Sequence, residues 1–368
     1  MKNVKEWVCT VATASVIFVS GPALAGDPVD PALAASWAFV QKAMPGVPYS
    51  LLKAACAEGT VMIYHGTWIG AQNDQIAAFK KRFPCINVQK FSSTVGPLRE
   101  RFVSEFRAKR AIADVYQDSD PGTLNEFATN GMLMNYKISN DAAFRPESKK
   151  TGYWYPLRAA LVGIAWNTDR VSASEAKLLT EWKGVINPAW KGRAIVVDPV
   201  SGGVAYLPWY AWTKLYGESF IDQIGALKPR VVNGINNAAA ALASGDVAVL
   251  LNASETGLLP LWLKGAPIRW SLPAPGIGPV TGQGIASDAP HPNAAKLYHE
   301  YAFTEEGYGI WQKLGGAPLR IGLKDQRKVA SESWYKLPAE MFEYDPAAAT
   351  ADHQKVLARF RKAVGVDK

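Results

Sequence analysis

Apolar positions along this chain follow two alternating spacings. Short apolar runs, typical of buried strands, alternate with longer stretches in which apolar residues recur every three or four positions, as on one face of a helix. The predicted strands are 60–64, 86–91, 113–117, 159–166, 194–197 and 247–251. The predicted helices are 71–83, 98–109, 123–130, 204–216, 236–243, 257–264, 293–303, 306–314 and 354–364. Strands that alternate with helices predict an α/β protein built on largely parallel sheets.

Length and composition indicate a globular protein with two domains. The chain has 368 residues, of which 48% are hydrophobic and 20% charged, so a disordered protein or a long coiled coil is excluded. At about 150 residues per domain, this length predicts two domains. Proline and glycine are concentrated in residues 267–284, which we interpret as a crossing or hinge segment.

The first 25 residues are typical of a secretory signal. Lys2 and Lys5 form a basic start, residues 11–19 are apolar, and Ala23-Leu24-Ala25 fits the small-x-small rule of signal peptidase. The apolar stretch is shorter than the roughly 20 residues that a membrane-spanning helix needs. We therefore expect an exported protein that is cleaved after Ala25.

Cys56 and Cys85 are the cysteines that remain after this cleavage. In an oxidising compartment two thiols most simply form one disulfide, which would be worth about 3 to 4 kcal/mol through closure of the chain between them. Two buried free thiols are the alternative, since sequence does not show whether their Cα atoms lie within about 7 Å.

Charge and motifs weigh against nucleic-acid binding and against catalysis. The net charge of +8 favours anionic partners, but no short segment concentrates the basic residues, so no nucleic-acid partner is expected. The sequence contains no G-x-S-x-G elbow, H-E-x-x-H motif, P-loop or complete G-x-G-x-x-G motif. Its histidines are scattered and suggest no metal site. We expect a protein that is not an enzyme and carries no cofactor.

The turns after the predicted strands carry small hydroxyl residues, glycine, asparagine and aspartate at helix starts. In open α/β sheets ligands bind beyond the carboxyl ends of the strands, where helix N-termini present backbone N–H groups. The candidate ligand-binding residues are Thr67, Trp68, Ser93, Thr94, Ser119, Asp120, Ser201, Gly202, Gly203, Asn236, Ser254, Glu255 and Thr256. Ordinary N-capping is the alternative role for any single one of these turns.

The order of several motifs resembles a known family. The motifs are Glu58–Tyr64, Ala113–Val115, Gly131–Leu133, Tyr153–Arg158, Gly163–Thr168, Pro188–Arg193 and Ala243–Ala248. Together they resemble periplasmic solute-binding proteins of ABC importers, most closely the branch that includes ferric-iron-binding proteins, over residues 51–319. The resemblance implies a two-lobed, type II periplasmic binding protein-like α/β fold in which each lobe is a mixed sheet flanked by helices. It also implies a ligand cleft between the lobes and closure by a hinge motion.

The resemblance also suggests how the chain is divided and what it works with. We expect a signal peptide at 1–25, an N-terminal extension at 26–50, lobe one at 51–158 and 285–320, and lobe two at 159–284 and 321–368. The protein would be a periplasmic monomer that delivers a small solute to a membrane permease.

The resemblance leads us to expect an anionic solute rather than iron. Iron-binding members carry a histidine, a glutamate and a tyrosine pair where this sequence has Trp68, Ser119, Glu255 and Thr256. Only Glu255 could be a strong ligand for iron, so we expect no metal site. The family's anion position matches Ser201-Gly202-Gly203, and Arg158 could add a bidentate contact.

These residues suggest a phosphate, phosphonate or carboxylate head group. The solute could be zwitterionic, because Asp118, Asp120 and Glu255 favour a positive group, and Trp68 could give it a cation–π face. Binding of ferric iron together with an anion is the alternative. A secreted α/β enzyme is a remote one, and a receptor ligand or adhesin is a third class.

Overall fold

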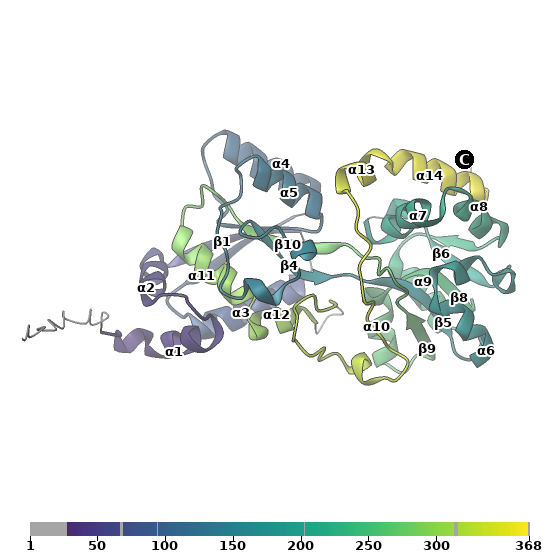
Figure 1. Cartoon of the computed structure of the whole chain (residues 1–368), viewed down its shortest axis with the longest axis horizontal. Coiled ribbons are helices and arrows are strands. Elements are labelled where there is room, and N and C mark those ends of the chain that lie inside the picture. Colours follow the sequence, from purple (N-terminus) through teal and green to yellow (C-terminus); the bar gives the residue numbers. More distant parts are fainter. Residues whose placement is uncertain (1–27, 67–68, 94, 202, 313–315, 367–368) are drawn as a thin grey trace, which may run out of the picture.

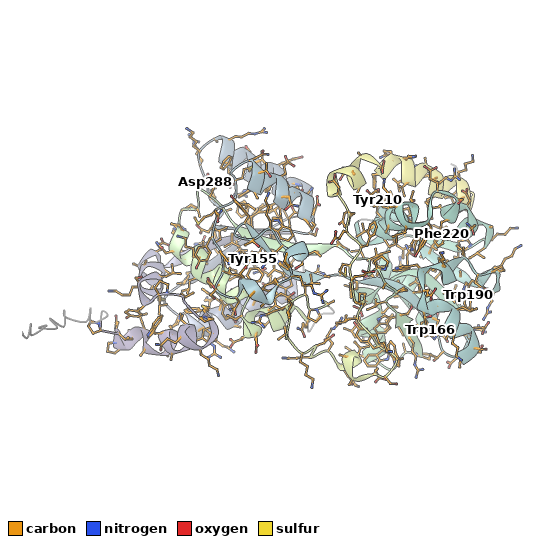
Figure 2. The ribbon with its side chains drawn as sticks, in the orientation of Figure 1. Tyr155, Trp166, Trp190, Tyr210, Phe220 and Asp288 are labelled. Carbon is orange, nitrogen blue, oxygen red and sulfur yellow. A yellow bond between two sulfur atoms is a disulfide. The ribbon has the colours of Figure 1, made fainter. Side chains whose placement is uncertain are left out.

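Two lobes lie side by side in this protein, and each is built on its own sheet (Figure 1). The structure is a computed structural model that describes residues 28–66, 69–93, 95–201, 203–312 and 316–366. Within these residues each lobe holds one five-stranded sheet. Each lobe also has its own aromatic core, marked in Figure 2 by Tyr155 in the first and by Trp190 and Phe220 in the second.

The sheet of the first lobe has the strand order β2-β1-β3-β10-β4. Its strands are β1 (Thr60–His65), β2 (Asn87–Ser92), β3 (Val115–Asp118), β4 (Trp154–Ala159) and β10 (Val280–Ile285). The helices of this lobe are α1 (Ala34–Ala43), α2 (Tyr49–Glu58), α3 (Ile69–Arg82), α4 (Val95–Arg107), α5 (Pro121–Thr129), α11 (Pro292–Ala302) and α12 (Glu305–Gln312). Short 3-10 helices lie at Pro31–Leu33, Asp141–Ala143 and Pro146–Ser148.

The sheet of the second lobe has the order β7-β6-β8-β5-β9. Its strands are β5 (Val162–Asn167), β6 (Ala194–Val197), β7 (Arg230–Val232), β8 (Val249–Ser254) and β9 (Ile268–Ser271). The helices here are α6 (Ala173–Ala176), α7 (Gly203–Tyr216), α8 (Ser219–Ala226), α9 (Ile235–Ala243), α10 (Glu255–Leu263), α13 (Pro346–Ala351) and α14 (His353–Val364). The 3-10 helices are Lys177–Thr180, Trp182–Ile186, Pro188–Trp190, Pro199–Ser201 and Lys328–Ser331.

The carboxyl ends of β1 to β4 in the first sheet face the carboxyl ends of β6, β7 and β8 in the second. Strand β10 is antiparallel to both β3 and β4, so β1 to β4 all run in one direction and end at one edge. Only residues 160–161 separate the end of β4 from the start of β5. Val162, which begins β5, pairs with Ser254 at the end of β8, and β6 and β7 run parallel to β8. We call these two opposed sets of strand ends the facing edges.

The single strand predicted at 159–166 is wrong, because the chain changes sheets within it. Residues 159–162 are all buried, so the apolar run continues through the crossing and the pattern cannot reveal where one strand ends.

The Pro- and Gly-rich segment 267–284 contains β9 and most of β10, with the second crossing at 272–279 between them. Packing explains why residue 282 is glycine, since a Cβ there would lie 2.5 Å from Leu124 Cδ1 and 2.7 Å from Trp154 Cε3.

The N-terminal segment 28–58 packs onto the first lobe. Val40 and Met44, on and just after α1, and Leu52 of α2 are fully buried in the same core as Phe79. The predicted disulfide is confirmed: Cys56 in α2 is bonded to Cys85, with the Cα atoms 5.2 Å apart.

The C-terminal segment 316–366, which we call the tail, returns from the first lobe to cover the second (Figure 1). Ala317 pairs with Ala159 beside the first crossing. Further on, Tyr335 is buried in the second lobe and Phe360 of α14 packs on Trp209, with ring centroids 4.7 Å apart. Helix α13 also contacts α5, so the tail touches the first lobe again. Across the described ranges, no helix is long and apolar enough to cross a membrane.

Candidate functional site

The described candidate residues lie at or just after strand ends at the facing edges. Ser93, Ser119 and Asp120 come after β2 and β3, and Arg158 is near the end of β4. On the second lobe they are Gly203 at the start of α7, Asn236 in the first turn of α9, and Ser254, Glu255 and Thr256 at the β8–α10 turn. Thr67, Trp68, Thr94 and Gly202 lie outside the described residues, and for Ser201 only the backbone is described.

On the first lobe, Arg99 of α4 holds the carboxylates that follow β3. Its Nε and Nη2 each lie 2.8 Å from an oxygen of Asp118, which also accepts a hydrogen bond from the Tyr116 hydroxyl at 2.9 Å. Asp118 is buried, which raises the pKa of its carboxyl, while the hydrogen bonds from Arg99 lower it.

Asp120 shares this arginine and caps α5. It receives Arg99 Nη2 at 3.1 Å and the backbone N–H of Gly122 at 3.0 Å. We expected Asp118 and Asp120 to offer negative charge to a ligand, and Arg99, which pairs with both, offsets one of these two charges. Nothing in the sequence order relates Arg99 to the two aspartates, so it was not predicted.

His65 is the buried last residue of β1. Its Nε2 lies 2.6 Å from the hydroxyl of Ser92, at the end of the neighbouring strand β2. This hydrogen bond joins the ends of two parallel strands at the facing edge of the first lobe.

Arg158 places a buried positive charge beside the crossing between the two sheets. The residue is 6% exposed and pairs with Thr281 of β10 in the sheet. Its side chain packs on Gly316, where a Cβ would lie 3.1 Å from the Arg158 Cβ. Burial lowers the pKa of the guanidinium to about 10, so the group is still charged at neutral pH.

Two aromatic residues of α7, Tyr206 and Trp209, contact the tail. The Tyr206 hydroxyl donates to the carbonyl of Ala349 in the tail at 2.7 Å. Trp209 is fully buried against Trp212 and Phe360.

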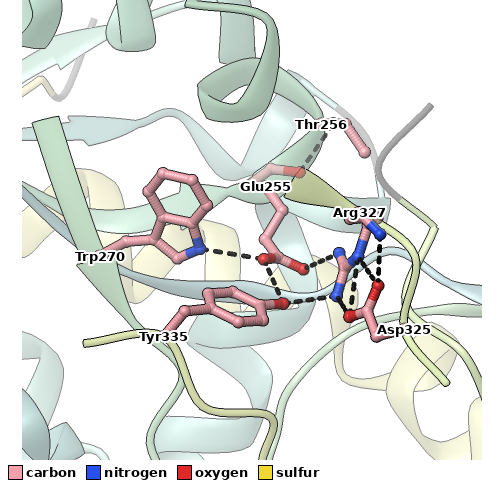
Figure 3. Close-up of polar contacts among 7 residues, drawn as sticks. Glu255, Thr256, Trp270, Asp325, Arg327 and Tyr335 are labelled. Carbon is pink, nitrogen blue, oxygen red and sulfur yellow. Dashed lines mark hydrogen bonds and ion pairs between the residues drawn. The ribbon is translucent and has the colours of Figure 1, made fainter. Parts of the chain in front are cut away.

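Glu255, the first residue of α10, is enclosed by donors from other elements (Figure 3). Its side chain is 1% exposed. One carboxylate oxygen accepts from Trp270 Nε1 at 2.9 Å and from the Tyr335 hydroxyl at 2.8 Å, and the other from Arg327 Nη1 at 3.1 Å. Glu255 therefore does not present an unoccupied carboxylate for an iron ligand. Arg327 and Tyr335 come from the tail, far along the chain, and no local pattern could have indicated them.

The described residues contain no group of three or more histidine, cysteine, aspartate or glutamate side chains that could hold a metal ion. Next to Glu255, the hydroxyl groups of Ser254 and Thr256 lie 2.8 Å apart. The candidate residues that the structure describes therefore combine helix starts and small hydroxyl residues with carboxylates that arginines hold.

Several known proteins are similar to this chain in sequence or in structure. The chain is 23% identical over 237 residues to an uncharacterized protein of Haemophilus influenzae, covering 61% of this chain and 67% of that protein. The iron-bound structure of HitA from Pseudomonas aeruginosa is 22% identical, with a TM-score of 0.64, and the similarity covers 83% of this chain and 99% of HitA.

AfuA from Actinobacillus pleuropneumoniae, a periplasmic binding protein solved with fructose-6-phosphate, is 19% identical with a TM-score of 0.59. The similarity covers 84% of this chain and 99% of AfuA. These similarities establish the fold expected from the sequence, namely two mixed sheets flanked by helices as in periplasmic binding proteins.

Residues 61–315 match the family described as bacterial extracellular solute-binding protein. This match includes both sheets and both crossings, and the family consists of binding proteins rather than enzymes. The chain belongs to the bacterial extracellular solute-binding protein family.

Proposed function

We propose that this protein is exported, loses residues 1–25, and captures a small polar solute with an anionic head for delivery to the membrane permease of an ABC importer. Phosphate, phosphonate and carboxylate groups are the proposed heads, and a zwitterionic solute is included. Family membership supports capture of a solute, whereas the anionic head is inferred from the charges at the facing edges.

The observation that carries this proposal is the position of Arg158. Arg158 is a buried cation one residue before the end of β4, and a positive charge at this edge attracts an anion that binds nearby. Helices α5, α7 and α10 begin at the same edges, and helix N-termini favour negative charge. Arg158 and these helix starts would act together on one anionic group.

Ferric iron is the second candidate, and the comparisons favour it over an organic anion. HitA was solved with iron, and a similar structure from Campylobacter jejuni is named a ferric binding protein, whereas AfuA was solved with a sugar phosphate. The contacts of Asp118 with Arg99 and of Glu255 with Arg327 argue against iron, since these carboxylates are already held by cations.

Thermal unfolding of the mature protein with a panel of solutes tests the proposal. The panel holds inorganic phosphate, 2-aminoethylphosphonate, fructose-6-phosphate, citrate and ferric citrate. A bound solute at about 1,000 times its dissociation constant should stabilise the native state by about 4 kcal/mol, a shift of several degrees. A shift with a phosphorus-containing solute or citrate supports the proposal. A shift with ferric citrate but not with citrate contradicts it.

Substitution of Arg158 then tests the residue that carries the proposal. Arg158→Met should weaken binding of the anion by roughly 10- to 100-fold, because hydrogen bonds to charged groups are worth about 1.5 to 3 kcal/mol. Arg158→Lys keeps the positive charge, so it should lose less affinity for the anion than Arg158→Met does. Arg361→Met removes an exposed charge from α14 and serves as the control. Equal affinities of wild type and Arg158→Met, measured by calorimetry, would contradict the assignment.

A further inference from the structure

We propose that Arg327 in the tail is a specificity-determining positioning residue: it neutralises Glu255 and thereby keeps the β8–α10 turn receptive to an anion. This inference rests on the proposed function, since it concerns the charge that a solute meets at the same facing edge. Residues 61–315 match the family, so Arg327 lies outside the matched segment.

Arg327 and Glu255 form an ion pair that is closed to water. The Arg327 and Glu255 side chains are each 1% exposed, and Arg327 Nη1 lies 3.1 Å from the Glu255 carboxylate. Such a pair is strongly coupled, because removal of one partner leaves an uncompensated charge in a medium that screens it poorly.

The arginine is held in place from its other side. Asp325 receives Arg327 Nη2 at 2.6 Å and Arg327 Nε at 2.9 Å, and it also accepts the backbone N–H of Arg327 at 3.0 Å. The Tyr335 hydroxyl accepts from Arg327 Nη2 at 2.5 Å and donates to Glu255 at 2.8 Å. These contacts fix the guanidinium in the orientation that reaches Glu255 (Figure 3).

The donors to Glu255 differ in charge. Trp270 and Tyr335 contribute neutral hydrogen bonds, whereas Arg327 contributes the positive charge. Without that charge, the carboxylate at the first position of α10 would offset the positive end of the helix dipole and weaken its attraction for an anionic solute. Arg327 also pairs with Asp325, so these three side chains together carry one net negative charge, and loss of Arg327 would leave two beside the turn that carries Ser254 and Thr256.

A set of charge variants tests this role by measuring affinity for a solute of each sign. Arg327→Met frees the negative charge of Glu255, so the affinity for 2-aminoethylphosphonate or inorganic phosphate should fall at least tenfold. Glu255→Gln should raise that affinity, and Glu255→Gln combined with Arg327→Met should return it to within about threefold of wild type. Lys355→Met removes a tail cation that pairs with Glu218 away from the edge, and it should change nothing.

The double variant separates an electrostatic role from a structural one. If the tail contact matters only for folding, the single Arg327→Met and the double variant will both lose the solute, and this result would overturn the inference. An unchanged affinity of Arg327→Met for the anion would also overturn the inference. Near-ultraviolet circular dichroism shows whether Arg327→Met folds. If it does not, the affinity of Glu255→Gln for the anion tests the inference by itself. An affinity of Glu255→Gln equal to or below that of wild type would overturn the inference.

Failure of the proposed function would give a different result. If wild type binds ferric citrate but not citrate or phosphorus-containing solutes, the anionic solute is wrong, while the charge argument still predicts tighter iron binding by Arg327→Met. The double variant should then remove that gain, and an absence of gain would overturn the inference.

Discussion

Charged side chains near the facing edges form two clusters, each of one arginine and two carboxylates, and these contacts decide which charges a solute meets. Asp118 is held by Arg99 of α4, and Glu255 by Arg327 of the tail. Both carboxylates are buried, where a charge is tolerated only when it is compensated. Each arginine offsets one of the two carboxylates that it contacts, so each cluster adds one net negative charge rather than two.

A buried histidine in the first lobe leads to a prediction about pH. His299 is 1% exposed, and its Nδ1 lies 3.1 Å from Nε2 of Gln283. Because Gln283 Oε1 accepts from Gln117, its amide nitrogen donates to His299, which requires the neutral ring with its proton on Nε2. Burial lowers the pKa of His299 to about 3.

Stability should therefore fall as pH drops below about 6.5, the pKa of His299 in the unfolded chain. Between pH 3 and 6.5 the unfolded state binds the proton and the folded state does not, so wild type should lose about 2 kcal/mol from pH 7 to pH 5 through this residue. His299→Gln keeps an acceptor for Gln283 and removes the titration. Urea denaturation of both proteins at the two pH values measures the difference, and equal losses would contradict it.

At the residue scale, the sequence indicated which turns carry polar side chains but not what those side chains contact. Strand ends can be found from apolar periodicity. Ser119, Asp120 and Ser254 were therefore predicted to lie at or after the ends of strands, and they do. Their partners come from distant elements: Arg99 lies on another helix and Arg327 in the tail. Such pairs arise only from tertiary packing, which one sequence does not reveal.

At the scale of elements, strongly periodic segments were predicted well and glycine-rich ones were not. Strand β6 was predicted with its observed bounds, Ala194–Val197, and α14 differs from its prediction by one residue. Strand β10 was interpreted as part of a hinge, since Gly282 and Gly284 interrupt its apolar pattern. Those glycines are needed because neighbouring side chains and backbone approach the strand closely.

Close packing of α8 on α14 leads to a second stability prediction. A Cβ on Gly225 of α8 would lie 2.2 Å from the carbonyl oxygen of Ala363, which is in α14. Gly225→Ala should therefore push the tail helix away and cost about 1 to 3 kcal/mol, the usual range for overpacking. Denaturant unfolding measures this cost.

A glycine in another helix is the matched control. A Cβ on Gly309 of α12 would meet nothing within 4 Å, so Gly309→Ala should be neutral or stabilise the protein by up to about 1 kcal/mol. Similar effects of the two substitutions would show that helix propensity, and not the approach of α14, controls the result at Gly225.

At the scale of the whole molecule, the sheets are separate units joined by few connections. Residues 160–161 and 272–279 connect them, and the tail makes a third link through Ala317 and the contact of α13 with α5. The order of the family motifs in the sequence predicted the two-lobed arrangement, because many motifs at fixed spacings together constrain the topology of the chain. The tail lies beyond the matched segment, so its contacts could not be inferred in the same way.

This arrangement leads to a prediction about shape. Each lobe has its own core, so a solute bound at the facing edges should move the lobes as rigid bodies about the crossings. Saturation with the solute found in the thermal panel should lower the radius of gyration measured by small-angle X-ray scattering. Arg158→Met at the same solute concentration should retain the larger value, because it binds less solute. If calorimetry shows saturation while the scattering curve is unchanged, the lobes do not move on binding, and the contact between α13 and α5 would then be a fixed brace and not one that changes with closure.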